Sequence, residues 1–200
     1  VVSGSKFALK CVEAGVDAVV AEGFEAGGHN GREETTTLAL IPQVRKVTGL
    51  PLIAAGGIAT GEGMAAVFAL GAEGVQVGTR FALTEESSAS DAFKQKCISL
   101  KEGDTILSLK KISPTRLVKN DFYHQVQELE DRGASADELR SLLGRGRSRR
   151  GIFEGDLVEG ELEIGQVASL IDTVVPAEQV VEGMMKEYYE AVEKLNRIVF

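Results

Sequence analysis

The sequence predicts an α/β fold: the C-terminal part of a TIM (β/α)8 barrel with an inserted smaller α/β subdomain. Helical and strand patterns alternate through the first 80 residues, and one helix–glycine–strand joint occurs twice, as EAGVDAV at 13–19 and ALGAEGV at 69–75. Such joints are typical of βα units around a parallel sheet. Only three strands are complete, whereas an eight-stranded barrel takes about 250 residues. We therefore expect the N-terminal strands of the barrel to be missing from this chain; a small open sheet is the alternative.

The composition excludes several classes of protein. Lys and Arg number 22 against 30 Asp and Glu, so the net charge of −8 argues against a nucleic-acid-binding surface. Nothing approaches the ~18 unbroken apolar residues of a membrane span. Cys11 and Cys97 lack metal-like spacing, so we expect a reducing, cytoplasmic location rather than a disulfide scaffold.

The first 84 residues predict the last βα units of the barrel. Short apolar, β-branched runs are typical of strands buried on both faces, and Gly15 and Gly71 are placed to end helices. Val1 and Val2 are expected to end one further strand. The expected helices are 5–14, 36–47 and 61–70, and the expected strands are 18–21, 51–55 and 74–78.

After residue 84 the pattern changes, and we expect an inserted subdomain over 85–155. A return segment and a C-terminal helix that packs on the barrel follow over 156–200. The amphipathic stretch 176–198 predicts that long helix; a homodimer through it is the alternative. The other expectations are helices at 88–102, 122–131 and 136–143, strands at 105–109 and 115–118, and a basic turn at 144–151.

Glycine turns follow two neighbouring strands. Gly56 and Gly57 end one strand, and Gly78 with Thr79 ends the next. Glycines let backbone amides approach an anion, and the helix N-terminus after the first turn favours negative charge. The last two strands of such barrels carry the usual phosphate site. The pair of turns predicts a phosphate-bearing ligand, whereas each turn alone fits a merely tight joint.

The first strand ends in a glycine-rich loop that contains His29. A histidine at a barrel strand end can act as a general acid or base near neutral pH. An exposed loop histidine, or one that caps the next helix, is the alternative. His124 lies in a helical stretch, and neither histidine has a partner at metal-ligand spacing, so no metal site is predicted.

These segments carry a family resemblance. EGFEAGGH at 22–29, AAGGIA at 54–59 and VQVGTRF at 75–81 resemble the FMN-dependent enoyl-acyl-carrier-protein (enoyl-ACP) reductase II and nitronate monooxygenase superfamily, formerly the 2-nitropropane dioxygenase group. The similarity continues through GIFEGD at 151–156 and IGQVASLI at 164–171. It implies an FMN-binding barrel with a smaller domain inserted after the last barrel strand.

The resemblance also implies roles for matching positions. Gly56, Gly57, Gly78 and Thr79 match the loops that hold the FMN phosphate. His29 matches the catalytic histidine of the family. Three further flavin-contacting positions are implied: Glu22 and the Gly27–Gly28 turn beside the flavin, and Gln166 from the C-terminal part.

Two activities compete within the superfamily. In a reductase, NAD(P)H and FMN reduce an enoyl thioester carried on acyl carrier protein or CoA, in fatty acid synthesis. In a nitronate monooxygenase, FMN and oxygen oxidise a small alkyl nitronate. The basic stretch 145–150 followed by Glu154-Gly155-Asp156 favours the reductase and suggests docking of acidic acyl carrier protein. Asn30 and Arg32 are less typical of that branch. A third hypothesis is a non-catalytic barrel that binds a phosphate ligand.

Overall fold

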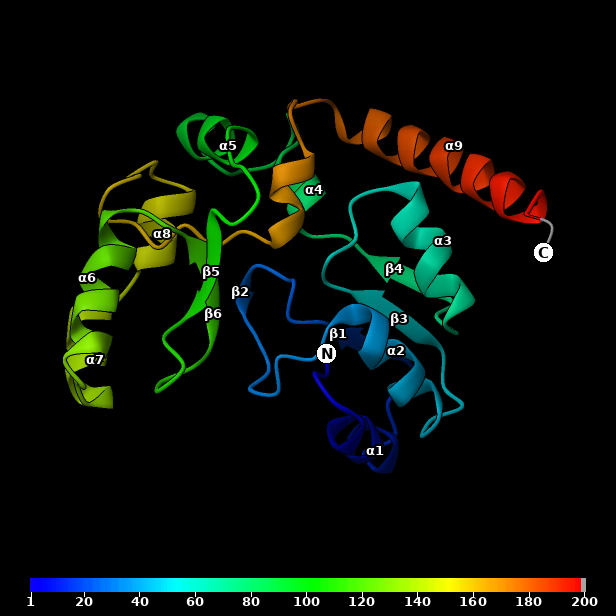
Figure 1. Cartoon of the computed structure of the whole chain (residues 1–200), viewed down its shortest axis with the longest axis horizontal. Coiled ribbons are helices and arrows are strands. Elements are labelled where there is room, and N and C mark those ends of the chain that lie inside the picture. The colour runs from blue at the N-terminus through cyan, green and yellow to red at the C-terminus, as the bar shows by residue number, and fades with distance from the viewer. Residues whose placement is uncertain (199–200) are drawn as a thin grey trace.

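The computed structural model describes residues 1–198 and contains a three-stranded parallel sheet, as predicted (Figure 1). The strands are β1 (Val19–Glu22), β3 (Leu52–Ala55) and β4 (Gly74–Gln76), in the order β1-β3-β4. Both pairings are parallel. Val2 adds a parallel bridge to Ala21 on the outer side of β1, which confirms the expected strand tail. The helical and strand periodicities therefore identified this sheet correctly.

Four helices pack around the parallel sheet. They are α1 (Ser5–Glu13), α2 (Thr37–Arg45), α3 (Gly61–Ala69) and α9 (Ala177–Asn196), each within two residues of its predicted bounds. One hydrophobic core joins them to the strands through Ala8, Val19, Ile41, Leu52, Val67 and Met184. The strands are buried because their apolar side chains contact helices, as expected for a parallel sheet.

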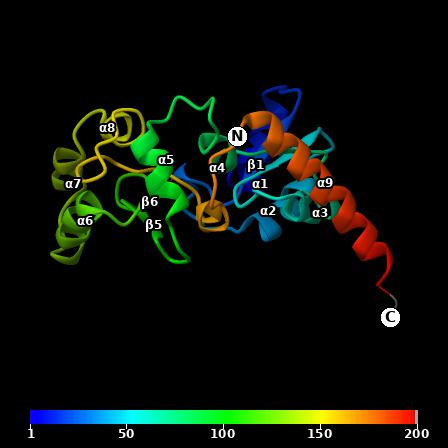
Figure 2. The same cartoon turned by 90° about the horizontal axis from the view of Figure 1, so that it is seen from above.

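The C-terminal helix α9 packs along α3 at very short range (Figure 2). A Cβ added at Gly61 would lie 2.1 Å from the backbone nitrogen of Tyr188, so only glycine fits at this crossing. Phe68 and Tyr188 stack edge to face, with ring centroids 5.6 Å apart. Helix α9 thus packs against α3 of its own chain.

The parallel sheet and the helices around it form one lobe, the parallel lobe. A second lobe, the antiparallel lobe, is built on an antiparallel sheet. Its strands are β2 (Gly28–His29), β6 (Thr115–Val118) and β5 (Thr105–Ser108), in the order β2-β6-β5. The sequence predicted β5 and β6 but not β2, whose two residues pair with Thr115 and Arg116. The helices α6 (Asp121–Asp131) and α7 (Ala136–Leu143) complete this lobe around a core with Leu117, Phe122 and Leu139.

A third cluster connects the two lobes. It contains the short helix α4 (Thr79–Ala82), α5 (Asp91–Ile98) and the 3-10 turn η1 (Gln166–Leu170). Its core includes Leu83, Phe93, Cys97 and Ile164. Burial raises the pKa of the Cys97 thiol to about 12, so this cysteine is a packing residue. The segment 156–176 crosses from the antiparallel lobe back to the parallel one, orange in Figure 1.

The basic stretch 144–151 is not a simple turn, and that prediction was wrong. It contains the helix α8 (Arg147–Ile152), entered through two glycines in the left-handed region, Gly144 and Gly146. The Arg147 side chain turns back and its Nε donates to the Leu143 carbonyl at 2.9 Å. This caps the end of α7, which explains why an apparently exposed arginine begins a helix.

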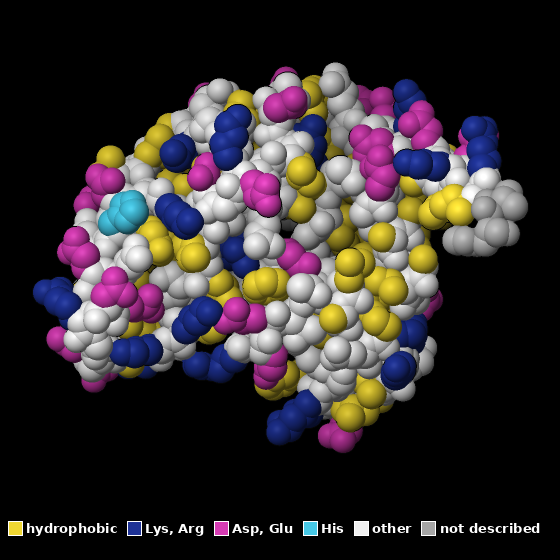
Figure 3. All heavy atoms as spheres, in the orientation of Figure 1, with side chains coloured by type: hydrophobic (Ala, Val, Ile, Leu, Met, Phe, Trp, Pro, Cys, Tyr) yellow, Lys and Arg dark blue, Asp and Glu magenta, His cyan; other side chains and the backbone are white. Residues whose placement is uncertain are grey.

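The two lobes differ in their surfaces. Hydrophobic side chains gather over the lobe with the parallel sheet, whereas charged side chains cover much of the other lobe in the same view (Figure 3). Exposed apolar residues include Phe7 and Leu9 on α1 and Val181 and Leu195 on α9. Over residues 1–198, no helix is both long enough and apolar enough to cross a membrane.

Candidate functional site

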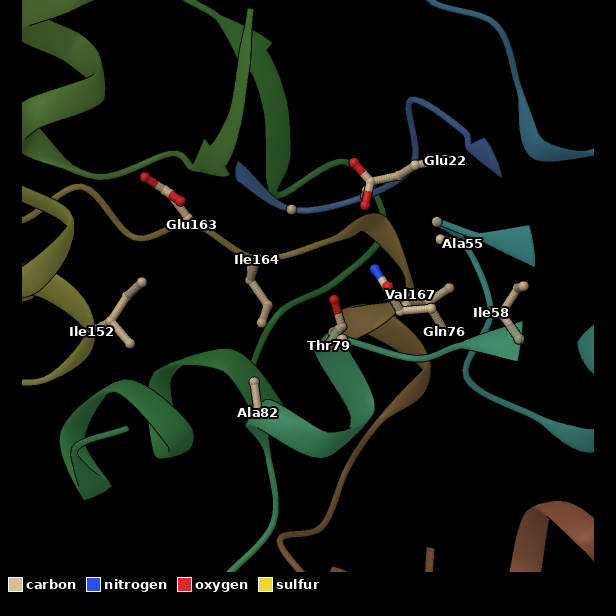
Figure 4. Close-up of a pocket in the computed structure, with 15 residues that line it drawn as sticks. Glu22, Ala55, Ile58, Gln76, Thr79, Ala82, Ile152, Glu163, Ile164 and Val167 are labelled. Atoms are coloured by element: carbon tan, nitrogen blue, oxygen red, sulfur yellow. The ribbon is translucent and has the colours of Figure 1, made fainter. Parts of the chain in front are cut away.

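The cavity that collects most of the predicted site residues, which we call the main cavity, lies where the parallel strands β1, β3 and β4 end (Figure 4). Its volume is about 260 Å³. Six of the predicted ligand-binding residues line it together: Glu22, Gly27, Gly56, Gly57, Gly78 and Thr79. Carboxyl ends of parallel strands are the usual place for ligands in α/β folds, and this position agrees with that rule.

The Gly56–Gly57 turn has two consecutive residues with positive φ, +84° and +70°. The backbone amides of both glycines donate to no protein acceptor in the described chain. The Thr37 hydroxyl donates to the Gly56 carbonyl at 2.7 Å. Because the two polar groups of a trans peptide point in opposite directions, this bond turns the Gly57 N–H away from Thr37. The turn therefore offers fixed, free amides of the kind that bind anions.

The second glycine turn contributes space and a hydroxyl. A Cβ at Gly78 would meet nothing within 4 Å, so folding does not require a glycine here. Thr79 accepts a hydrogen bond from the Gly165 amide at 3.0 Å through Oγ1. The hydroxyl keeps its own proton, which it can donate to a ligand. Gly78 thus leaves open space next to the Thr79 hydroxyl, whose position is fixed by the bond from Gly165.

Two of the first amides of α3 are already bonded within the chain, so this N-terminus supplies fewer free amides than expected. The Glu187 carboxylate of α9 accepts from the Gly61 amide at 2.8 Å, and the Thr60 hydroxyl accepts from Gly63 at 3.2 Å. A carboxylate already complements the positive end of the helix. An anion bound here would therefore rely mainly on the glycine amides.

Two carboxyl groups stand on one side of the cavity. Glu22 comes from the end of β1 and Glu163 from the return segment (Figure 4). Burial raises the pKa of Glu22 above the usual value for a glutamate. Apolar residues complete the wall, among them Ile152, Ile164 and Val167. The cavity therefore has a backbone-amide side and an acidic side.

The loop after β1 is fixed from three directions. The Glu25 carboxylate accepts hydrogen bonds from the Thr37 amide at 3.0 Å. Arg116, buried on β6, donates to the Phe24 carbonyl at 3.0 and 2.9 Å. The backbone N–H of Gln166 donates to the backbone carbonyl of Glu25 at 2.9 Å. Elements far apart in sequence thus hold the loop that joins Glu22 to His29.

Three predicted site residues lie outside the main cavity. His29 is exposed and lines a second cavity of about 190 Å³ with Arg147, Ser148 and Glu161. Gly28 is buried, and a Cβ there would lie 2.8 Å from a Glu163 carboxylate oxygen. Gln166 lines neighbouring grooves instead. Pairing of β2 with β6 explains the displacement, because it draws His29 into the second lobe.

The basic cluster is largely engaged within the chain. Arg147 lies 4.4 Å from the Phe122 ring centroid and donates to Glu159. Arg149 and Arg150 pair with Glu154 and Asp156. Reversing the charge of Arg147 would therefore disturb folding, so this residue cannot test docking cleanly.

The sequence did not identify the side-chain part of the site. Glu161, Glu163 and Ser148 gather between the two cavities, and Thr37 and Arg116 fix the loop. Alternating polar and apolar residues over 161–164 were the available signal for a strand-like segment. Within residues 1–198, no group of three or more metal-ligating side chains occurs.

Comparisons with known proteins agree on one family. A family model described as nitronate monooxygenase matches residues 1–187. FabK from Thermotoga maritima has a solved structure that is 42% identical, with a TM-score of 0.91, over 98% of this chain and 61% of that one. Nitroalkane oxidase from Streptomyces ansochromogenes is 32% identical, with a TM-score of 0.77, over 97% and 58%. Both likenesses extend over the parallel and antiparallel lobes.

A curated relative matches a shorter part of the chain. A probable nitronate monooxygenase from Staphylococcus saprophyticus is 41% identical over 128 residues, which is 59% of this chain and 36% of the relative. The chain thus spans less than two thirds of each of these three proteins.

Proposed function

Because the chain belongs to the nitronate monooxygenase family, we propose that it is part of an FMN-dependent oxidoreductase, an enoyl-thioester reductase of type II. In this proposal NAD(P)H drives reduction of a trans-2-enoyl thioester on acyl carrier protein or CoA. The supporting observation is the 42% identity to FabK over 98% of the chain, since we group FabK with the reductase branch. The nitroalkane oxidase structure is less similar over almost the same span.

The proposed architecture is a partial barrel. Residues 1–84 would form its last βα units, 85–155 the inserted subdomain, and 156–200 the return segment with the C-terminal helix. The parallel sheet is open in the described residues, with β4 paired on one side and only the Val2 bridge beyond β1. The apolar side chains exposed on α1 and α9 are the surfaces that further barrel elements would cover.

The main cavity fits FMN at its phosphate end. The free amides of Gly56 and Gly57 would bind phosphate oxygens, with the Thr79 hydroxyl as a further donor. Gly78 would leave room for the ligand. Glu22 and the Gly27–Gly28 turn would lie beside the flavin, and Gln166 would approach from its neighbouring groove. When bound, FMN would supply the hydride-transfer chemistry.

His29 would act at the adjoining cavity as the residue that orients the thioester or assists protonation. Its exposed position at a cavity rim suits a group that meets a substrate arriving from solvent. We place the protein in the cytoplasm, with neither a nucleic acid nor a membrane as a partner. A homodimer remains part of the proposal for the longer protein.

A nitronate monooxygenase is the second candidate, favoured by the matching family model and by the curated relative. Following flavin absorbance of the longer protein without oxygen separates the two. Bleaching by NAD(P)H and recovery on adding crotonyl thioester are expected for the reductase. Bleaching by an alkyl nitronate, with none by NAD(P)H, would overturn the reductase proposal.

A further inference from the structure

One hydroxyl group bridges two carboxyl groups in the wall between the two cavities. Ser148 on α8 places its Oγ 3.1 Å from Glu161 Oε2 and 2.6 Å from Glu163 Oε1. A serine hydroxyl has a single proton to donate. If both carboxyl groups were ionised, one of these two contacts would bring oxygen lone pairs together without a proton.

Neither carboxyl group of the pair forms an ion pair in the described part of the chain. Glu161 is only 5% exposed. Arg147, the nearest arginine on α8, directs its guanidinium to Glu159 and to the carbonyls that end α7. Arg116 on β6 directs its guanidinium to the Phe24 carbonyl. A buried, unpaired carboxylate is costly, so the group takes up a proton instead.

We propose that Glu161, Ser148 and Glu163 share one extra proton, and that this proton makes Glu163 a proton donor at the wall of the main cavity. Glu161 carries the proton and donates to Ser148 Oγ, and Ser148 donates to Glu163 across the shorter contact. Glu163 lines the main cavity, whereas Ser148 and Glu161 line the cavity that contains His29. The three residues therefore connect the solvent-facing histidine cavity with the interior of the site.

The direction of the pKa shift agrees with this assignment. Burial raises the pKa of Glu161, and the charge of Glu163 raises it further. The Ser148 hydrogen bond, His29 on β2 and Arg147 on α8 oppose these effects but do not outweigh them. We therefore assign the extra proton to Glu161.

The role of the pair in turnover rests on the proposed function. Reduction of an enoyl thioester adds a hydride at the β-carbon and a proton at the α-carbon, where the electron pair of the former double bond is left. The Ser148 proton moves to Glu163 while the Glu161 proton moves to Ser148, so that Glu163 becomes protonated. Glu163 would then give this proton to the α-carbon, and Glu161 would be reprotonated from water in the histidine cavity. Glu161 and Ser148 are positioning residues, because they act through Glu163.

Carbon NMR of ¹³C-labelled glutamate carboxyl groups tests the shared proton in the full-length protein before and after FMN is added. Glu161→Gln and Glu163→Gln assign the two signals. We expect two separate titration steps, the upper one above the usual glutamate range, and we expect Ser148→Ala to move both. Ser141→Ala is the matched control, since its Oγ bonds an exposed helix carbonyl, and it should move neither. Two carboxyl groups that titrate together in the usual range would overturn the proposal.

The pH profile of thioester reduction tests the transfer itself. In the wild type, activity should fall as pH rises through the upper step, and Ser148→Ala should shift that fall while KM for the thioester stays unchanged. An unshifted profile would overturn the relay. Failure of the proposed function looks different: FMN or the thioester would not react at all, while the shared titration measured without FMN would still support the proton pair.

Discussion

The parallel lobe and the antiparallel lobe contribute different chemical groups to the site. The parallel lobe contributes backbone: free amides at Gly56 and Gly57 and open space at Gly78, with few side-chain donors. The antiparallel lobe contributes side chains, with His29, Ser148, Glu161 and Glu163 brought together from segments more than a hundred residues apart. A backbone site depends on conformation, whereas a side-chain site depends on protonation and packing. Substitutions on the two sides should therefore fail in different ways.

His29→Ala should give the largest effect on turnover with the smallest effect on folding. The side chain is exposed on a short strand, so we expect unfolding free energy to change by less than about 0.5 kcal/mol. Loss of an acid–base or orienting group should lower kcat by about 10²-fold or more. Steady-state kinetics beside FMN titration measures both. Unchanged turnover would show that His29 takes no part in the reaction, and would leave the antiparallel lobe a structural role.

Gly56→Ala should destabilise the Gly56–Gly57 turn, because it strains the backbone there. The residue has φ +84°, and an added Cβ would lie 2.5 Å from the Gly23 carbonyl oxygen. Left-handed backbone alone costs about 1–2 kcal/mol for a residue with a Cβ. We expect a loss of more than about 2 kcal/mol in urea unfolding, together with weaker FMN binding.

Gly63→Ala is the matched control for that substitution. It lies in α3, where the nearest atoms to a new Cβ are 3.7 Å away, so stability should stay the same or rise by up to about 1 kcal/mol. Equal losses in the two variants would contradict a special conformation at Gly56.

Arg116→Met should weaken the contact between the loop after β1 and the antiparallel lobe. The guanidinium donates twice to the Phe24 carbonyl, and removing it leaves a half-buried acceptor without its partner. We expect a loss of about 1–3 kcal/mol in urea unfolding. Arg32→Met also removes bonds between the loop and the antiparallel lobe, at Lys110 and Ile112, but in solvent. Its effect should stay within about 0.5 kcal/mol; an equal effect would mean that burial of Arg116 is unimportant.

Glu161→Gln should change how stability depends on pH, the smallest of these effects. Burial raises the folded-state pKa of Glu161, so the folded protein retains a proton that the unfolded chain releases. Wild-type stability should therefore fall as pH rises from the unfolded-state pKa through the raised one. Glu161→Gln removes this dependence, and denaturation at a series of pH values measures the difference. Identical slopes in the two proteins would contradict a buried, protonated Glu161.

The same contrast explains what the sequence predicted. The parallel strands and the glycine turns were predictable, because periodicity and glycine placement are local properties of 18–21, 51–55 and 74–78. Strand β2 was missed because two residues carry no period and depend on pairing with β6. Helix α8 was missed because its stability comes from Arg147 capping α7.

The acidic pair could not be predicted for a related reason. Nothing local to Glu161 or Glu163 shows that Ser148 lies between them, since that contact depends on how α8 packs against the return segment. Local sequence patterns thus located the glycine turns. Only the tertiary structure showed that Ser148, Glu161 and Glu163 lie together.

Binding of FMN compared with riboflavin, which lacks the phosphate, tests whether the glycine turns form a phosphate site. We expect the full-length protein to bind FMN at least about tenfold more tightly, a difference of ~1.4 kcal/mol. Gly78→Ala adds a methyl group to open space in the cavity without strain, so it should weaken FMN binding while leaving unfolding unchanged. Equal affinities for the two flavins in the wild type would contradict a phosphate site at these glycine turns.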